Sequence, residues 1–148
     1  MLFREATLAH IPQLQKVRRA VKENVLSNPA LVTDAHCADY LTKRGKGWVC
    51  EVDGTVVGFS IVSLSDKNVW ALFVHPDYEG RGIGRKLQHL MLQWYFRQTK
   101  EKLWLSTEAH SRAAAFYKKS GWTEVGWHNQ QELKFEITFN DWKQHFSV

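Results

Sequence analysis

The spacing of apolar residues predicts one short strand and two helices at the start of the chain. Residues 2–6 are strand-like, and from residue 7 or 8 to about residue 24 apolar side chains recur every three or four positions, which places them on one face of a helix. A Thr-Asp pair at 33–34 suits the N-cap of a second helix that ends near residue 43. We interpret the polar side of the first helix as a solvated face; it carries Lys16, Arg18, Arg19 and Lys22.

A β-hairpin is predicted near the middle of the chain. Two apolar segments, 48–52 and 55–62, flank Asp53 and Gly54, and an Asp-Gly pair is the strongest short-range signal for a tight hairpin turn. A further strand at 69–74 is almost continuously apolar, as expected for a strand that is covered on both faces. This strand should therefore lie in the middle of the sheet.

The second half of the chain alternates between helical and strand-like spacing. A helix is predicted from residue 83 to about residue 96, a strand at 102–106, and an alanine-rich helix at about 111–120. Two final strands follow at about 122–127 and 132–139. The predicted order is β-α-α-β-β-β-α-β-α-β-β, which is typical of an α+β domain with a mixed, mostly antiparallel central sheet flanked by helices.

Composition and charge exclude several classes of protein without choosing a function. The 148 residues are 44% hydrophobic, so a disordered chain is excluded and one domain over residues 1–148 is expected. Twenty Lys and Arg against 15 Asp and Glu give a net charge of +5, but these residues are dispersed, so no nucleic-acid partner is expected. The N-terminal residues lack the apolar stretch of a signal peptide or a membrane span. Cys37 and Cys50 are too few for a disulfide framework, which favours a cytoplasmic location.

The segment 69–88 carries the pattern that most strongly suggests a ligand site. Glycines at positions 80, 82 and 84 lie between an apolar strand and an amphipathic helix, and glycine lets a backbone turn tightly and approach a ligand closely. The helix N-terminus adds unpaired N–H groups and the positive end of its dipole, and Arg81, Arg85 and Lys86 add positive charge. The segment therefore predicts a phosphate or pyrophosphate site. A turn that only changes the chain direction is the alternative.

Other nucleotide and metal motifs do not fit this chain. The loop has the spacing G-x-G-x-G, which differs from the Rossmann spacing, and no Gly-Lys-Ser/Thr of a Walker motif occurs. None of the seven histidines has H-x-x-x-H or H-E-x-x-H spacing, so no metal is expected.

Two segments resemble the GNAT superfamily of N-acetyltransferases. E-G-R-G-I-G at 79–84, after a strand and H-P-D-Y, resembles the Q/R-x-x-G-x-G/A acyl-CoA signature of that superfamily. T-E-A-H-S-R-A-A-A-F-Y-K-K-S-G-W at 107–122 is similar to its strand-to-helix segment, which ends in F-Y-x-x-x-G-F/W. The order of predicted elements is also similar over almost the whole chain. The resemblance implies an acetyl-CoA-dependent N-acetyltransferase.

The resemblance also assigns residues to acetyl-CoA. The strand that contains Leu72, Phe73 and Val74 resembles the one whose backbone pairs with the pantetheine arm. The amides implied to hold the pyrophosphate are those of Gly80, Arg81, Gly82, Ile83, Gly84 and Arg85. His110 stands where the family often has an asparagine and would hydrogen-bond the pantetheine arm. The first signature position, usually Gln or Arg, is Glu79, which removes a donor near the phosphates.

Tyr117 is the candidate general acid. It matches the tyrosine that often protonates the departing thiolate in GNAT proteins, and its ordinary pKa of about 10 is close to that of a thiol. Packing of the short helix by Phe116 and Tyr117 is the alternative. Glu108 is the candidate base, directly or through water; further candidates are His75, His110 and Glu23. No dedicated base is required if the amine arrives neutral. A backbone amide near Phe73 or Val74 is implied for the oxyanion.

The sequence therefore predicts transfer of an acetyl group from acetyl-CoA to a primary amine, by direct attack in a ternary complex. The alternative is a catalytically weak acyl-CoA-binding or regulatory module, because Glu79 and His110 depart from the family pattern. Residues 24–46 and 126–133, which the resemblance places at the acceptor site, show no cluster that identifies the amine. Edge strands and a C-terminal tail with Trp142 and Phe146 are compatible with a homodimer.

Overall fold

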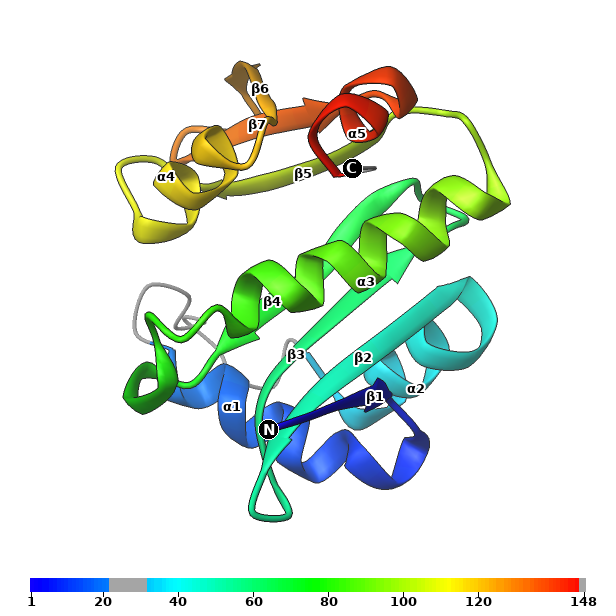
Figure 1. Cartoon of the computed structure of the whole chain (residues 1–148), viewed down its shortest axis with the longest axis vertical. Coiled ribbons are helices and arrows are strands. Elements are labelled where there is room, and N and C mark those ends of the chain that lie inside the picture. Colours follow the sequence, from blue (N-terminus) through cyan, green and yellow to red (C-terminus); the bar gives the residue numbers. More distant parts are fainter. Residues whose placement is uncertain (22–31, 147–148) are drawn as a thin grey trace.

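The computed structural model describes residues 1–21 and 32–146, which form one sheet with helices on both faces (Figure 1). The strands are β1 (Leu2–Glu5), β2 (Gly45–Val52), β3 (Thr55–Ser63), β4 (Asn68–Val74), β5 (Leu103–Glu108), β6 (Thr123–Trp127) and β7 (Glu132–Ile137). The α-helices are α1 (Ile11–Ala20), α2 (Asp34–Asp39), α3 (Ile83–Gln98), α4 (Arg112–Lys119) and α5 (Phe139–Phe146). Shorter turns are the 3-10 helices η1 (Leu8–His10) and η5 (Pro76–Tyr78) and the π-helical η4 (Tyr40–Arg44). The predicted α+β class is confirmed.

The seven strands are arranged in the order β1-β2-β3-β4-β5-β7-β6, so β4 is central, as its apolar sequence predicted. All neighbouring strands are antiparallel except β4 and β5, which are parallel. These two strands pair only at Asn68 and Trp104, near their beginnings, so they separate toward their C-terminal ends. The predicted hairpin is confirmed, because Asp53 and Gly54 have φ values of 51° and 78°, the left-handed geometry of a tight turn.

Two hydrophobic clusters cover the opposite faces of the sheet. Because successive side chains of a strand point to opposite faces, Cys50 and Leu72 pack on the side of α3, whereas Val49 and Phe73 pack on the side of α1. Both cysteines are buried free thiols. In residues 1–21 and 32–146, no helix is long and apolar enough to span a membrane.

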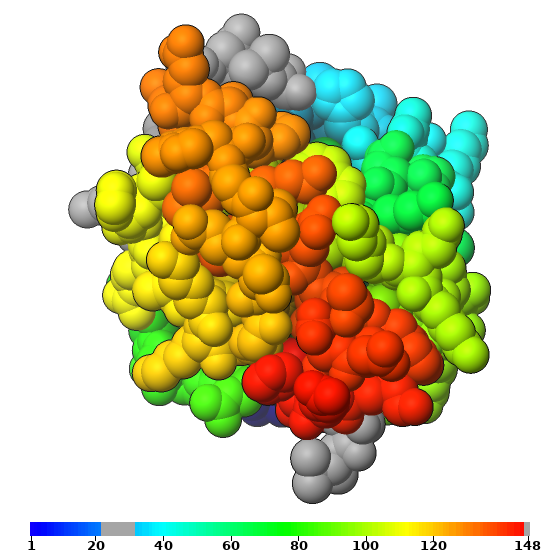
Figure 2. Space-filling view, turned by 90° about the horizontal axis from the view of Figure 1, so that it is seen from above, coloured from blue at the N-terminus to red at the C-terminus, as the bar shows by residue number. Residues whose placement is uncertain are grey.

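The C-terminal residues form a helix that the sequence analysis missed. The last strand ends at Ile137 rather than at residue 139, and α5 follows directly. Thr138 and Asp141 begin this helix by exchanging hydrogen bonds between their backbone N–H groups and side-chain oxygens. The Trp142 ring packs 5.4 Å from the Phe96 ring of α3. Figure 2 shows the red α5 beside the orange segment of β6 and β7. The predicted strand was therefore two residues too long, and the segment expected as a C-terminal tail is a helix.

The first helix is shorter than its apolar spacing predicts. It begins with the turn η1 and ends at Ala20, and Val21 is already extended, with φ −85° and ψ 108°. The prediction of helix at Val21 was wrong, and the remainder of the predicted helix, with Glu23, lies outside the described residues.

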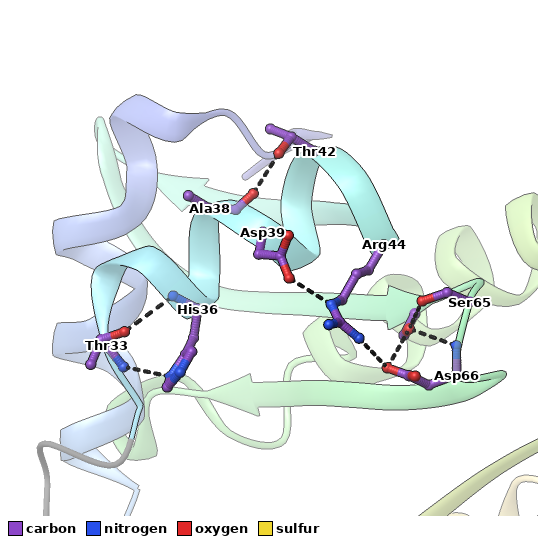
Figure 3. Close-up of polar contacts among 9 residues, drawn as sticks. Thr33, His36, Ala38, Asp39, Thr42, Arg44, Ser65 and Asp66 are labelled. Atoms are coloured by element: carbon purple, nitrogen blue, oxygen red, sulfur yellow. Dashed lines mark hydrogen bonds and ion pairs between the residues drawn. The ribbon is translucent and has the colours of Figure 1, made fainter.

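The second helix is fixed at both of its ends (Figure 3). At its start Thr33 Oγ1 accepts a hydrogen bond from the His36 N–H, and His36 Nδ1 accepts one from the Thr33 N–H. After its end, Arg44 forms ion pairs with Asp39 at 2.5 Å and with Asp66 at 3.5 Å. This arrangement ties η4 to the β3–β4 turn.

Candidate functional site

A cavity of about 640 Å³ lies where β4 and β5 separate. Most of its described lining comes from β4, the glycine loop with the start of α3, the second half of β5, and α4. Its lining comprises residues 69–74, 78–80, 82–85, 105–107, 111–113, 116 and 117, together with Val21. The cavity thus joins two segments that the sequence analysis singled out independently, the glycine loop and the segment that ends in Phe116 and Tyr117.

The glycine loop presents unpaired amides to this cavity. Gly80 and Gly82 have φ values of 76° and 80°, a backbone conformation that residues with a side chain rarely adopt. A Cβ at either position would have no atom within 4 Å apart from its chain neighbours. The first helical hydrogen bond of α3 runs from the Lys86 N–H to the Gly82 carbonyl. The N–H groups of residues 83–85 therefore have no helical partner and are available to an anion.

Gly84 differs from the other two glycines. It lies inside the first turn of α3 and its φ is not positive. A Cβ at this position would be 3.7 Å from Val74 Cγ2 and 3.9 Å from the Phe116 ring, which is ordinary van der Waals contact. Gly84 is thus not needed for the turn, and its missing side chain leaves space between β4 and α4.

Basic side chains surround the loop. The Arg81 guanidinium lies 4.9 Å from the centre of the Tyr78 ring and outside the cavity lining, whereas Arg85 contributes to it. A second cavity of about 520 Å³ shares Gly82, Arg85 and Phe116 with the first. Its other lining residues are Lys86, Gln88, His89, Lys119, Ser120, His145 and Phe146. The positive charge expected beside the loop is therefore present on both sides of it.

A bulge interrupts β4 where the strand borders the cavity. Ile61 pairs with Ala71 and Val62 pairs with Val69, which leaves Trp70 without a partner on β3. Trp70 consequently joins the cluster on the α1 face together with Phe73, and its ring stacks on Tyr40 at 4.2 Å. Trp70 is half-buried and lines the cavity.

Tyr117 is buried and also lines the cavity. Its ring packs at 5.4 Å from the Trp122 ring, and Trp122 in turn donates a hydrogen bond of 2.7 Å to the buried Gln88. No hydrogen bond of the Tyr117 hydroxyl is found among the described residues, so this group is available to a ligand. Burial raises the pKa of Tyr117 above its ordinary value, which keeps the hydroxyl protonated.

The side chains of Glu108, His110 and His75, the described candidates for the base, lie outside the lining. Glu108 is exposed at the end of β5, and its carbonyl accepts a hydrogen bond of 2.6 Å from Ser111. His110 is exposed in the turn that follows, with a φ of 63°. His75 Nδ1 accepts a hydrogen bond from the Asp77 N–H. The roles of Glu108 and His110 stay predictions. In the described part of the chain, no three His, Cys, Asp or Glu side chains gather in a way that could hold a metal ion.

A comparison with known protein families matches residues 43–124 to the acetyltransferase (GNAT) domain, which is more than half of the chain. The chain belongs to the GNAT acetyltransferase family. An uncharacterized N-acetyltransferase from Methanocaldococcus jannaschii is 32% identical over 98 residues, which are 57% of this chain and 43% of that protein. The chain thus spans less than half the length of that relative.

Solved structures share the fold of this GNAT domain. The PaiA N-acetyltransferase from Thermoplasma acidophilum, solved in complex with coenzyme A, has a TM-score of 0.81 at 14% identity, over 93% of this chain and 98% of that one. A ribosomal-protein-alanine N-acetyltransferase from Brucella melitensis has a TM-score of 0.75 at 24% identity, over 93% and 99% of the two chains. The family resemblance and the fold inferred from the motifs are confirmed.

The sequence analysis missed an ion pair at the mouth of this GNAT cavity. Glu79, at the position where the family usually has Gln or Arg, accepts a hydrogen bond of 2.6 Å from Arg112 Nη1. Both side chains line the cavity, and they connect the glycine loop to the first turn of α4. A pairing across 33 residues leaves no local signal in the sequence. Arg112 thus offsets the negative charge that Glu79 places beside the loop.

We expect removal of this arginine to weaken binding of CoA. Arg112→Gln leaves the Glu79 carboxylate uncompensated beside a polyanion, so affinity should fall by roughly two- to fivefold, the range of exposed ion pairs. Glu79→Gln should leave affinity unchanged or raise it. Lys118→Gln is the matched control, because it removes the same charge from α4 where that residue pairs with Glu124. Calorimetric titration measures all three variants, and equal weakening by Glu79→Gln would contradict this account.

Proposed function

We propose that this protein transfers an acetyl group from acetyl-CoA to a primary amine, by direct attack within a ternary complex. The observation that carries the proposal is the single cavity that joins the unpaired amides of the glycine loop to the Tyr117 hydroxyl. Membership of the GNAT family supports the same reaction.

The residues around the cavity suit acetyl-CoA. The amides from Gly80 to Arg85 would hold the pyrophosphate at the N-terminus of α3, where the helix dipole favours an anion. The backbone of Leu72, Phe73 and Val74 would pair with the pantetheine arm, since β4 lacks a strand partner on the side of β5 beyond Asn68. The basic second cavity would meet the remaining phosphate charge.

The neutral amine nitrogen adds to the thioester carbonyl carbon of acetyl-CoA to give a tetrahedral oxyanion, and the carbon–sulfur bond then breaks as the carbonyl re-forms. The nitrogen gives its extra proton to water or, through water, to Glu108. Within the cavity, Tyr117 holds a proton that it would donate to the departing sulfur. Its raised pKa makes it a weaker acid than an exposed tyrosine, so it donates only as negative charge develops nearby. A backbone amide of β4 near Phe73 or Val74 would stabilise the oxyanion.

Calorimetric titration with acetyl-CoA, CoA and NAD tests the binding half of this proposal. The account predicts saturable binding of acetyl-CoA and CoA and none of NAD, because the loop lacks the Rossmann spacing. Equal affinity for NAD, or absence of CoA binding, would contradict it. Binding of acetyl-CoA without transfer to any amine would instead favour the acyl-CoA-binding module.

A further inference from the structure

Arg18 is a half-buried cation without a polar partner among residues 1–21 and 32–146. The sequence pattern placed it on a solvated face of the first helix, and that prediction was wrong for Arg18. Its guanidinium lies 5.0 Å from the centre of the Trp70 ring and 4.9 Å from that of Phe73. Its Nη2 atom is buried and lacks a hydrogen-bond partner in the part of the chain that the structure describes. By contrast, the neighbouring Arg19 is exposed.

An arrangement of this kind is unfavourable unless a ligand completes it. Buried guanidinium groups in folded proteins are normally paired with carboxylates or hydrogen-bonded to several acceptors. Burial lowers the pKa of Arg18 from its ordinary value, and the only described group that favours its charge is the thiol of Cys37. The two aromatic rings supply part of the missing stabilisation through their π faces, but they accept no hydrogen bond along the edge of the guanidinium plane.

Arg18 lies on the side of the cavity from which an acceptor would enter. The opening between β4 and β5 passes through the sheet, so its walls belong to both faces. The glycine loop and α4 lie on the face of α3, where acetyl-CoA would bind. Trp70 and Phe73 lie on the face of α1 and line the cavity, and both rings contact the Arg18 guanidinium. Arg18 itself is not among the lining residues, so it reaches the cavity wall through these two rings. Val21, three residues after Arg18, lines the cavity as well.

We propose that Arg18 binds a carboxylate of the acceptor, which is therefore a small amino acid rather than a simple amine. This inference rests on the proposed acetyl transfer and specifies its acceptor. Guanidinium is the side-chain group best suited to hold a carboxylate, because its planar edge offers two parallel N–H donors. The two rings contact the guanidinium but accept no hydrogen bond from Nη2, so this donor is left for such pairing among the described residues, and a bound carboxylate fixes the position of the amine.

The test compares α-amino acids with the corresponding amino acid amides, which keep the amine and the side chain but lack the negative charge. Initial rates of thiol release are measured at saturating acetyl-CoA for the unaltered protein, Arg18→Met and Arg19→Met, and mass spectrometry confirms the acetylated product. Methionine keeps the packing of the aliphatic stem. Arg19→Met is the matched control, because it removes the same charge from the exposed side of α1.

We expect the unaltered protein and Arg19→Met to prefer the acid over the amide in kcat/KM by roughly tenfold or more, mainly through KM. Arg18→Met should lower that ratio by roughly tenfold or more by removing the charge–charge pair. Its thermal unfolding midpoint should stay equal or rise, because an unpaired buried charge is removed. The amide group also changes the basicity of the amine, and this effect is the same for all three proteins. The decisive quantity is therefore the change in the acid-to-amide ratio between Arg18→Met and the other two proteins.

The outcomes separate this inference from the proposed function. Transfer to acids and amides at equal efficiency, or a preference that Arg18→Met leaves intact, would overturn the role of Arg18 and leave acetyl transfer standing. A lower unfolding midpoint of Arg18→Met with equal loss of rate on both substrates would show a structural role only. Absence of thiol release with every acid and amide would contradict both proposals together.

Discussion

Tyr117→Phe should lower kcat by about 100-fold, within the usual range for loss of a general acid, with little change in the affinity for acetyl-CoA. The phenyl ring keeps the contacts of Tyr117 with Phe116, Trp122 and Phe135, so only the proton donor is removed. Steady-state kinetics with an acetylated amine product, together with calorimetric titration, measures the two quantities separately.

The pH dependence and a matched variant sharpen this prediction. Because burial raises the pKa of Tyr117, the hydroxyl stays protonated beyond its ordinary pKa of about 10, so deprotonation of this group should cause no fall in kcat between pH 7 and that value. Tyr95→Phe is the control, because Tyr95 is fully buried and outside the cavity lining. If Tyr117→Phe and Tyr95→Phe have the same kcat, Tyr117 is not the general acid and only packs against its neighbours.

Gly84→Leu should abolish measurable binding of acetyl-CoA while the protein stays folded. The backbone at Gly84 suits any residue, and the new Cβ meets Val74 and Phe116 only at ordinary contact distance. A longer side chain must then occupy the space between β4 and α4 that the ligand needs. Affinity should fall by at least about 100-fold, because close-packed atoms cannot share that space. Titration calorimetry, with circular dichroism as the check on folding, measures the effect.

A second glycine provides a matched pair for the same question. Gly82→Ala and Gly54→Ala both place a side chain at nearly the same left-handed φ, 80° and 78°, in open space. Their costs to the free energy of unfolding should be similar, about 1 kcal/mol. Only Gly82→Ala should weaken acetyl-CoA binding, since Gly54 is not among the residues that line either cavity. Unchanged affinity in both Gly84→Leu and Gly82→Ala would remove the glycine loop from the binding site.

Local patterns predicted most of the fold. The Asp-Gly turn, the apolar central strand and the helix that follows the glycine loop depend on neighbouring residues, and the structure places all three as expected. The start of α5 also had a local signal in the Thr138 and Asp141 pair, which the sequence analysis did not use. Instead, Phe139 continues the alternation of apolar residues at 133, 135 and 137, so the strand was predicted to end at residue 139.

Features that depend on distant pairings could not be predicted. The separation of β4 from β5 follows from a register with one paired position, and this separation creates the cavity. The bulge at Trp70 turns that side chain to the face of α1, where it covers Arg18. Helical periodicity assigned Arg18 to solvent because the spacing within one helix carries no information about Trp70, which comes from a distant strand and packs on Arg18. The pair of Glu79 and Arg112 is hidden for the same reason.

The most direct test of the central claim is the initial rate at which thiol is released from acetyl-CoA, measured with and without a pool of primary amines that includes amino acids. The account predicts saturable release that depends on both the amine and acetyl-CoA, with each thiol matched by one acetylated amine in the mass spectrum. Release that is independent of amines, or no release from protein saturated with acetyl-CoA, would contradict acetyl transfer as the function of this cavity.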